Sequence, residues 1–312
     1  MSAFLPDQTR ISQVRLRTAN LQRALAFYVE VLGMKVCERT GLQIILSAAE
    51  EGPGLILLNE VLEAAPRPPR SAGLDHFAIR LPQRQDLAHA YRRLVKSDYP
   101  VGSGSDHGVS EAIYLNDPDG NGVELYADRP RSQWTWHSGQ IAMTTKPLDL
   151  DAVLASIKGQ PERADPPPQT DLGHIHLQVT DLAAAKRFYG EYLGLAVTQG
   201  SHAGSLFFSA GGYHHHIGVN TRAGEPRPSV KSVGLISYRL EVPVAEVLYC
   251  LRHRAPLLGY ETKIEPPETK PLLLRIRDPN GNWLEIHSWS REPSPTSLPA
   301  HLRDRQNAFR LE

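Results

Sequence analysis

Residues 117–124 read DPDGNGVE, and residues 278–285, which lie 161 positions further along, read DPNGNWLE. The same offset relates three other places: Gln13 and His174, Phe27-Tyr28 and Phe188-Tyr189, and Leu32-Gly33 and Leu193-Gly194. Four matches in one register indicate a duplicated chain. Such a repeat decides how the rest of the sequence is interpreted.

Each half of the duplication contains two modules that run strand, helix, strands. The opening strands alternate in polarity, and in the first and third modules a helix follows that a polar residue caps and a glycine ends. The expected elements are strand 11–17, a helix from Asn20 to Gly33, and strands 43–47 and 55–58; strand 74–81, helix 86–95, and strands 112–115 and 122–126; strand 172–179, a helix from Asp181 to Gly194, and strand 213–219; and a fourth module over about 233–288.

The modules predict two tandem domains. We expect a first domain at residues 9–128, a connector at 129–170, a second domain at 171–290 and a polar tail at 291–312. The connector holds two tryptophans, a short helical stretch near 148–157 and a triple-proline break.

Bulk composition excludes several classes of protein. The 312 residues include 34 basic and 34 acidic side chains, for a formal charge of +0, and no basic run points to a nucleic-acid partner. The two cysteines, Cys37 and Cys250, lie far apart and fit a reducing cytosol better than a disulfide framework. Without an apolar leader or a run of about 18 apolar residues, we expect a cytoplasmic protein that does not cross a membrane.

Histidines and carboxylates recur at equivalent places in the modules. These places are the third residue of the opening strand and the start of the closing strand. In chain order they hold Gln13 and about Leu55, His76 and Glu124, His174 and about His216, and Leu235 or Ser237 and Glu285. A lone strand histidine is usually a satisfied core or surface residue, but joint placement favours metal ligation. Two histidines and one carboxylate are typical of non-haem Fe(II).

The pairing of the modules decides which residues share a site. Pairing within each half would put Gln13 with His76 and Glu124, and His174 with His216 and Glu285. Pairing module two with module three would bring the metal ligands His76, Glu124, His174 and His216 together. We favour the second arrangement because it gathers the best ligands, which leaves Glu285 as a weaker alternative and a remnant of the duplication.

Three runs carry a resemblance to a known family: HGVSEA at 107–112, DPDGNG at 117–122 and GGYHHHIGVN at 211–220. From about residue 9 to 288 the chain resembles the vicinal oxygen chelate superfamily, which includes glyoxalase I, bleomycin-resistance proteins and extradiol dioxygenases. It looks most like the bacterial catechol-2,3-dioxygenase type. The resemblance implies an α+β fold of four βαβββ modules in two tandem glyoxalase-like domains, whose curved mixed sheets enclose a metal cavity.

The extradiol signature is matched in the second module. It asks for a histidine, then an apolar residue and tyrosine, then Asp-Pro-x-Gly and a ligand glutamate, which His107, Ile113, Tyr114, Asp117-Pro118, Gly120 and Glu124 satisfy. Ser105 departs from the residue expected two places before the histidine. The last module has Arg275 where the tyrosine belongs, so that copy looks degenerate.

The resemblance implies a role for each matching residue. His76, His174 and Glu124 resemble the iron ligands of an Fe(II)-dependent enzyme that opens a catechol-type aromatic diol with O2. His107 and Tyr114 would position and protonate oxygens of the bound intermediate. His214 or His216 could act as the acid–base histidine; period-two alternation would put both on one face of a strand and His215 on the other.

Two other functions fit the same residues. One is a glyoxalase-like lyase or isomerase in which four ligands bind Zn or Ni without O2; Mn(II) is a further alternative to Fe(II). The other is a metal-free binding or resistance protein. Metal identity and O2 dependence separate all three. Paired modules can also exchange between chains, which is compatible with a homo-oligomer.

Overall fold

The computed structural model describes residues 5–222, 228–264 and 273–289, so the tail expected at 291–312 lies outside the described residues. Module one comprises β1 (Arg10–Thr18), α1 (Leu21–Leu25) continuing as η1 (Ala26–Val31), β2 (Lys35–Thr40), β3 (Gln43–Ser47) and β4 (Ile56–Glu60). Module two comprises β5 (Gly73–Leu81), α2 (Arg84–Lys96), β6 (Ser103–Asp106), β7 (Ser110–Asn116) and β8 (Gly122–Asp128). The repeat therefore predicts the order of elements in this half.

The second half repeats this order. Module three comprises β12 (Asp171–Gln178), α4 (Leu182–Ala185) continuing as η3 (Lys186–Tyr192), β13 (Ala196–Gln199), β14 (Ser205–Ser209) and β15 (Ile217–Asn220). Module four comprises β16 (Gly234–Val242), α5 (Glu246–Leu257), β17 (Thr262–Ile264), β18 (Leu273–Arg277) and β19 (Trp283–Ser288). The connector between the halves contains η2 (Arg131–Gln133), β9 (Trp136–His137), β10 (Gln140–Ile141), β11 (Lys146–Pro147) and α3 (Leu150–Ala155).

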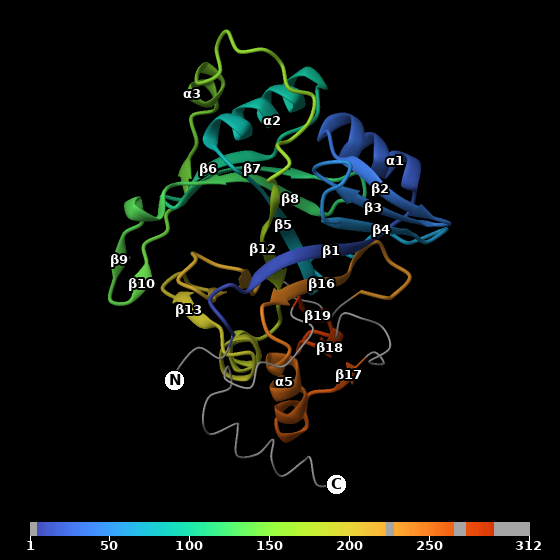
Figure 1. The fold of residues 1–312 in the computed structure, drawn as a ribbon, viewed down its shortest axis with the longest axis vertical. Helices are drawn as coiled ribbons and strands as arrows, with labels where there is room; N and C mark the ends of the chain where they lie inside the picture. The colour runs from blue at the N-terminus through green and yellow to red at the C-terminus, as the bar shows by residue number, and fades with distance from the viewer. Residues whose placement is uncertain (1–4, 223–227, 265–272, 290–312) are drawn as a thin grey trace.

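The strands form two large mixed sheets, each built from both halves of the chain (Figure 1). One has the order β17-β18-β19-β16-β1-β4-β3-β2, and joins modules four and one. The other has the order β11-β6-β7-β8-β5-β12-β15-β14-β13, and joins modules two and three. In each sheet the two opening strands pair antiparallel at the centre, β1 with β16 and β5 with β12. This is the module pairing that the ligand positions favour.

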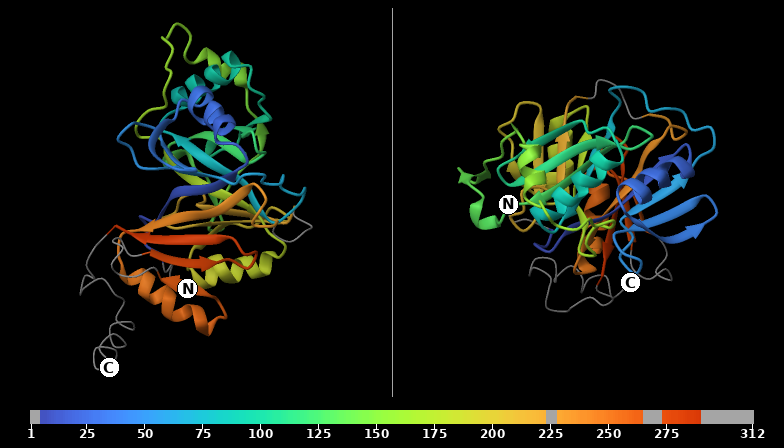
Figure 2. Two further views of the ribbon diagram at one scale, coloured as in Figure 1. Left: turned by 90° about the vertical axis from the view of Figure 1, so that its right-hand side faces the viewer. Right: turned by 90° about the horizontal axis from the view of Figure 1, so that it is seen from above.

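The helices, unlike the strands, stay with their own half. α1 and α2 lie at one end of the molecule, and α5 lies at the other end with the helix of module three (Figures 1 and 2). Tyr28 joins modules one and two, since its hydroxyl donates to Asp117 over 2.8 Å. Tyr189 makes the equivalent 2.7 Å bond to Asp278. Each tyrosine therefore fixes the Asp-Pro-x-Gly turn of the next module.

Two local expectations need correction. The helices that Asn20 and Asp181 cap begin as α-helices but widen into π-helical turns, with bonds such as Leu32 N to Phe27 O at 3.0 Å. The strand expected at 213–219 begins only at Ile217. Positive φ angles at Gly211 and Gly212 turn the chain just before the three histidines, which therefore lie in a loop.

A glycine in β12 allows close packing beside the central strands. A Cβ at Gly173 would lie 1.5 Å from the hydroxyl of Tyr126, a fully buried residue of β8. Gly173→Ala is therefore expected to lower the free energy of unfolding by about 3 kcal/mol through overpacking. Denaturant unfolding measures this. Gly190→Ala is the control, because its nearest neighbour would be a carbon of Phe208 at 3.6 Å; equal losses in both variants would contradict the packing argument.

In the part of the chain that the structure describes, no helix combines the length and apolar character needed to cross a membrane.

Candidate functional site

Three side chains from three adjacent strands converge at the centre of the second sheet. His76 lies on β5, Glu124 on β8 and His174 on β12. Glu124 and His174 both pair with Ala78 in the strand register, from opposite sides, and His76 precedes Ala78 by two residues on the same face. The small side chain of Ala78 leaves room between them.

The three ligand-type atoms face one another. One oxygen of Glu124, Oε2, lies 3.0 Å from Nε2 of His76 and 3.0 Å from Nε2 of His174. Within this trio, all candidate ligand atoms lie within 4.8 Å of one another. The structure thus brings together three of the four metal ligands that the sequence predicts.

The charges of the trio fit a divalent cation. Burial alone would raise the pKa of Glu124, but the imidazoles of His174 and His76 hold it well below its ordinary range. Burial lowers the pKa of His174 to about 4, so that its ring is neutral and can donate a lone pair. Burial opposes protonation of His76 as well, but contacts with Asp75 and Glu124 raise its pKa to about 9. A metal ion would replace that proton as the counter-charge of Glu124.

In the other sheet, the glutamate equivalent to Glu124 is also surrounded by positive charge. Glu285 there takes the place of Glu124, Ser237 that of His76 and Gln13 that of His174, by register. Two arginines provide the cations instead. A guanidinium nitrogen of Arg239 lies 3.1 Å from Glu285, and one of Arg275 lies 3.0 Å from it. Glu285, the weaker ligand alternative, is therefore held in an ion-pair cluster away from the trio.

A histidine and a tyrosine of module two lie beside the trio. His107 accepts a 2.8 Å hydrogen bond at Nε2 from the hydroxyl of Tyr114, and its Nδ1 donates to the carbonyl of Thr144 over 2.7 Å. The Tyr114 ring meets His76 edge-on, with centroids 5.4 Å apart. Burial and the charge of Glu124 raise the pKa of Tyr114 well above its ordinary value, so the phenol holds its proton at neutral pH.

The connector positions this pair. Thr144 bonds both the ring and the backbone of His107: its carbonyl accepts from Nδ1 of the ring, and its N–H donates to the carbonyl of His107 over 3.0 Å. Tyr114→Phe removes the donor to His107 without changing the ligand trio, and is expected to lower kcat by about 10- to 100-fold with the metal content unchanged. Steady-state oxygen uptake and metal analysis measure the two quantities, and a parallel loss of metal would contradict this assignment.

The trio and this pair line one cavity of about 600 Å³, within the usual range for small-molecule sites. Its wall also includes Asp75, whose carboxylate accepts hydrogen bonds from the side-chain amides of Gln178 at 2.9 Å and Asn220 at 3.1 Å. These two amides hold Asp75 near Nδ1 of His76, 3.6 Å away, and so orient that ligand.

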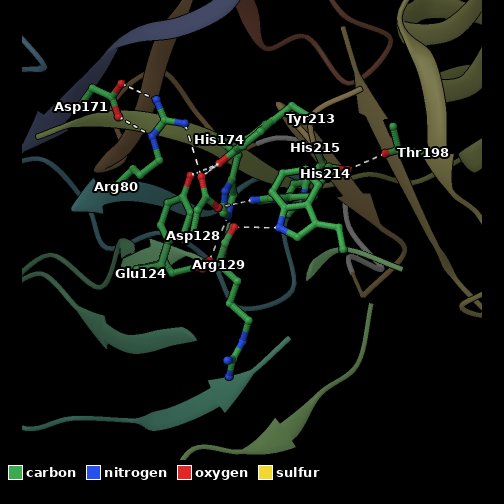
Figure 3. Close-up of polar contacts among 12 residues, drawn as sticks. Arg80, Glu124, Asp128, Arg129, Asp171, His174, Thr198, Tyr213, His214 and His215 are labelled. Atoms are coloured by element: carbon green, nitrogen blue, oxygen red, sulfur yellow. Dashed lines mark hydrogen bonds and ion pairs between the residues drawn. The ribbon is translucent and has the colours of Figure 1, made fainter. Parts of the chain in front are cut away.

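The three consecutive histidines point in different directions, because they lie in a loop. His215 lines the cavity and packs against His174, with ring centroids 4.1 Å apart and the ring planes tilted by 45°. His214 points away from the cavity to Asp128, 3.0 Å from its Nε2 (Figure 3). His216 turns its Nδ1 toward the hydroxyl of Ser209, 2.9 Å away.

Two of the predicted site residues therefore do not line the cavity. His216 is not among the cavity-lining residues and its Nδ1 is already engaged, so the structure does not place it as a fourth ligand. His214 lies behind the cavity wall, where its Nδ1 is 2.8 Å from Nδ1 of His215 and its ring meets that of His174 with centroids 5.8 Å apart. The sequence argument missed His215 because it assumed an extended strand. The Gly-Gly pair just before the triplet is the turn signal that could have revealed the loop.

Both halves of the chain match one family of known proteins. Residues 10–125 and 171–286 each match the model of the Glyoxalase/Bleomycin resistance protein/Dioxygenase superfamily. Catechol-2,3-dioxygenase of Bacillus subtilis (strain 168) is 42% identical over 280 residues, which cover 88% of this chain and 95% of that protein. Biphenyl-2,3-diol 1,2-dioxygenase 3 of Rhodococcus globerulus is 32% identical over 124 residues, or 38% of this chain and 63% of that protein.

A solved structure supports the fold. Glyoxalase I from Zea mays superposes with a TM-score of 0.57 at 15% identity, covering 90% of this chain and 92% of that one. The chain belongs to the Glyoxalase/Bleomycin resistance protein/Dioxygenase superfamily. Within that superfamily it is an extradiol-type dioxygenase.

Proposed function

We propose that this enzyme opens the ring of a catechol-type aromatic diol beside its two hydroxyls, with O2 and an Fe(II) ion held by His76, Glu124 and His174. The observation that carries the proposal is the convergence of this trio, the His107–Tyr114 pair and His215 on one cavity. The names of the relatives support it, since one refers to catechol and another to a biphenyl diol.

The metal, when bound, supplies the redox chemistry with O2 and a positive charge for the oxygens of the diol. The protein residues provide the geometry and the proton transfers. Tyr114 donates its only proton to Nε2 of His107 in this arrangement, so its hydroxyl oxygen can accept a hydrogen bond from a hydroxyl in the cavity. Rotation of the phenol O–H away from His107 would let the same proton be donated to an oxygen in the cavity. His215 lies on another wall, where its free nitrogen can accept a proton from a diol hydroxyl.

Two histidines and one carboxylate leave several coordination positions open, which suits a reaction that binds two substrates. The glyoxalase-like alternative needs a fourth protein ligand, for which His216 was the candidate. Since the structure directs His216 to Ser209, that alternative loses the residue on which it rested.

The test is metal analysis combined with oxygen uptake. The full chain, loaded with Fe(II) under anaerobic conditions, is mixed with air-saturated buffer and catechol or a substituted catechol. We expect one O2 to be consumed per diol and both atoms of that O2 to be found in the ring-opened product. Loading with Zn(II) provides the matched control and should give no oxygen uptake. A protein that binds no Fe or Mn and consumes no O2 with any diol would overturn the proposal.

A further inference from the structure

A buried chain of side chains runs from the cavity wall into the protein behind His215. His214 connects His215 to Asp128, with 2.8 Å between the two Nδ1 atoms and 3.0 Å between Nε2 of His214 and Oδ1 of Asp128. Both histidines are buried. Asp128 lies on β8 four residues after Glu124. The same strand therefore supplies two carboxylates: Glu124 to the His76–Glu124–His174 trio, and Asp128 to the series of hydrogen bonds through His214 (Figure 3).

The acceptor Asp128 fixes the proton positions along the chain. A carboxylate accepts only, so Nε2 of His214 carries a hydrogen and its Nδ1 is left as the acceptor. Nδ1 of His215 must then be the donor in the contact between the two rings. That tautomer leaves Nε2 of His215 without a hydrogen. Within the described residues this nitrogen has no hydrogen-bond partner, and its ring lines the cavity.

We infer that Asp128 and His214 are positioning residues, which set the tautomer of His215 so that its Nε2 presents a hydrogen-bond acceptor to the cavity instead of an N–H. The inference rests on the proposed function only where the group that this acceptor orients is said to be a diol hydroxyl. Neither Asp128 nor His214 lines the cavity. His214 meets the ring of His174 edge-on, with centroids 5.8 Å apart, but its hydrogen bonds join Asp128 to His215, and it is through these bonds that both residues act on His215.

The surroundings of Asp128 make it a fixed acceptor. Its second oxygen accepts a 2.9 Å hydrogen bond from the hydroxyl of Tyr213 and lies 3.4 Å from a guanidinium nitrogen of Arg80. Arg80 is itself held by Asp171 through two bonds, of 2.9 Å and 2.6 Å. These contacts, drawn in Figure 3, hold the carboxylate so that its other oxygen faces His214.

These contacts also predict what an amide would do at this position. In Asp128→Asn the side-chain oxygen should remain with its two donors, Tyr213 and Arg80, which turns the amide NH2 toward His214. Nε2 of His214 then becomes an acceptor and its Nδ1 carries the hydrogen. His215 must switch as well and would present an N–H to the cavity. If Asp128 had only a structural role, its replacement would not reverse the tautomer of His215.

The test is ¹⁵N spectroscopy of the full chain labelled at histidine, with and without Zn²⁺, beside kinetics after Fe(II) loading. In the unmodified protein His215 should carry its hydrogen on Nδ1; in Asp128→Asn it should carry it on Nε2. We expect kcat to fall about 10²-fold in Asp128→Asn, with metal content and KM for the diol unchanged. His215→Gln identifies the His215 signals.

Two variants of His214 separate tautomer from shape. His214→Asn keeps a side-chain acceptor for Nδ1 of His215 and should retain most of the activity, whereas His214→Leu removes that acceptor and should lose about as much as Asp128→Asn. Thr198→Val is the structural control, because the hydroxyl of Thr198 bonds backbone carbonyls and no ring nitrogen: that of His214 at 2.6 Å and that of Phe207 at 3.3 Å. It should lower thermal stability and leave both the tautomer and kcat unchanged.

The inference is wrong if His215 of the unmodified protein carries its hydrogen on Nε2, if Asp128→Asn leaves the tautomer and kcat unchanged, or if Thr198→Val causes the same loss of kcat. Failure of the proposed function gives a different result: the unmodified, metal-loaded enzyme would then consume no O2 with any diol. The spectra alone would in that case decide whether Asp128 and His214 set the tautomer.

Discussion

Glu124→Gln is expected to abolish metal binding and to bring oxygen uptake with a diol below detection. The carboxylate is buried, and one of its oxygens lies 3.0 Å from a ligand nitrogen of both His76 and His174. Glutamine keeps the shape but removes the negative charge, so the two imidazoles would have to hold a divalent cation without an anionic partner. Metal content per chain after dialysis measures the first effect and an oxygen electrode the second.

Glu285→Gln is the matched control for this prediction. Glu285 occupies the equivalent register position in the other sheet and is similarly buried, but its partners are Arg239 and Arg275. The variant should keep its metal and its activity. It should unfold at a lower temperature, because two guanidinium groups lose their shared carboxylate. If Glu285→Gln lost the metal and Glu124→Gln retained it, the site would have to be moved to the sheet of modules one and four.

Much of the fold follows from the sequence, because duplication makes each motif a check on another. The positions of the His76–Glu124–His174 trio were found by their equivalent places in the repeat, and the caps Asn20 and Asp181 by their polar side chains. The pairing of the sheets was different. No local propensity specifies which opening strands meet; only the number of good ligands that each pairing would gather favoured β5 beside β12.

Other features depend on contacts that sequence does not contain. The degenerate site was recognisable from Arg275 in place of tyrosine, but the second cation, Arg239, was not. By strand register, Arg239 takes the position that Ala78 has in the sheet of modules two and three. Its guanidinium reaches Glu285 at 3.1 Å, a contact that the sequence alone does not reveal. Likewise, the π-helical turn after α1 arises within a segment whose apolar spacing is typical of an ordinary helix.

The directions of the three consecutive histidine side chains depend on a loop that the alternating sequence pattern does not predict. Alternation along a strand would put His214 and His216 on the cavity side, but the strand β15 starts after them. The backbone of His216 instead accepts a hydrogen bond from Ile175 at 3.0 Å and donates one to Phe208 at 2.9 Å, which anchors that residue between two strands. The preceding turn then leaves His215 on the cavity wall.

His215→Gln is accordingly expected to lower kcat by about 10²- to 10⁴-fold, the usual contribution of a positioned acid–base group. His215 lines the cavity and packs against His174, but it is not part of the His76–Glu124–His174 trio, so the metal content should not change. Stopped-flow absorbance under anaerobic conditions measures diol binding, and single-turnover mixing with O2 measures the chemical steps. Binding should be retained and the later steps slowed.

His216→Gln distinguishes this assignment from the one that alternation suggests. The ring of His216 is engaged by the hydroxyl of Ser209 and, at 3.3 Å, by the N–H of Ala210, behind the cavity wall. Replacing it should lower stability, while metal content and the rate of ring opening per folded enzyme stay close to those of the unmodified protein. The reverse pattern, with His216→Gln losing metal and His215→Gln remaining active, would make His216 a ligand and would require the loop to adopt a different conformation around the metal.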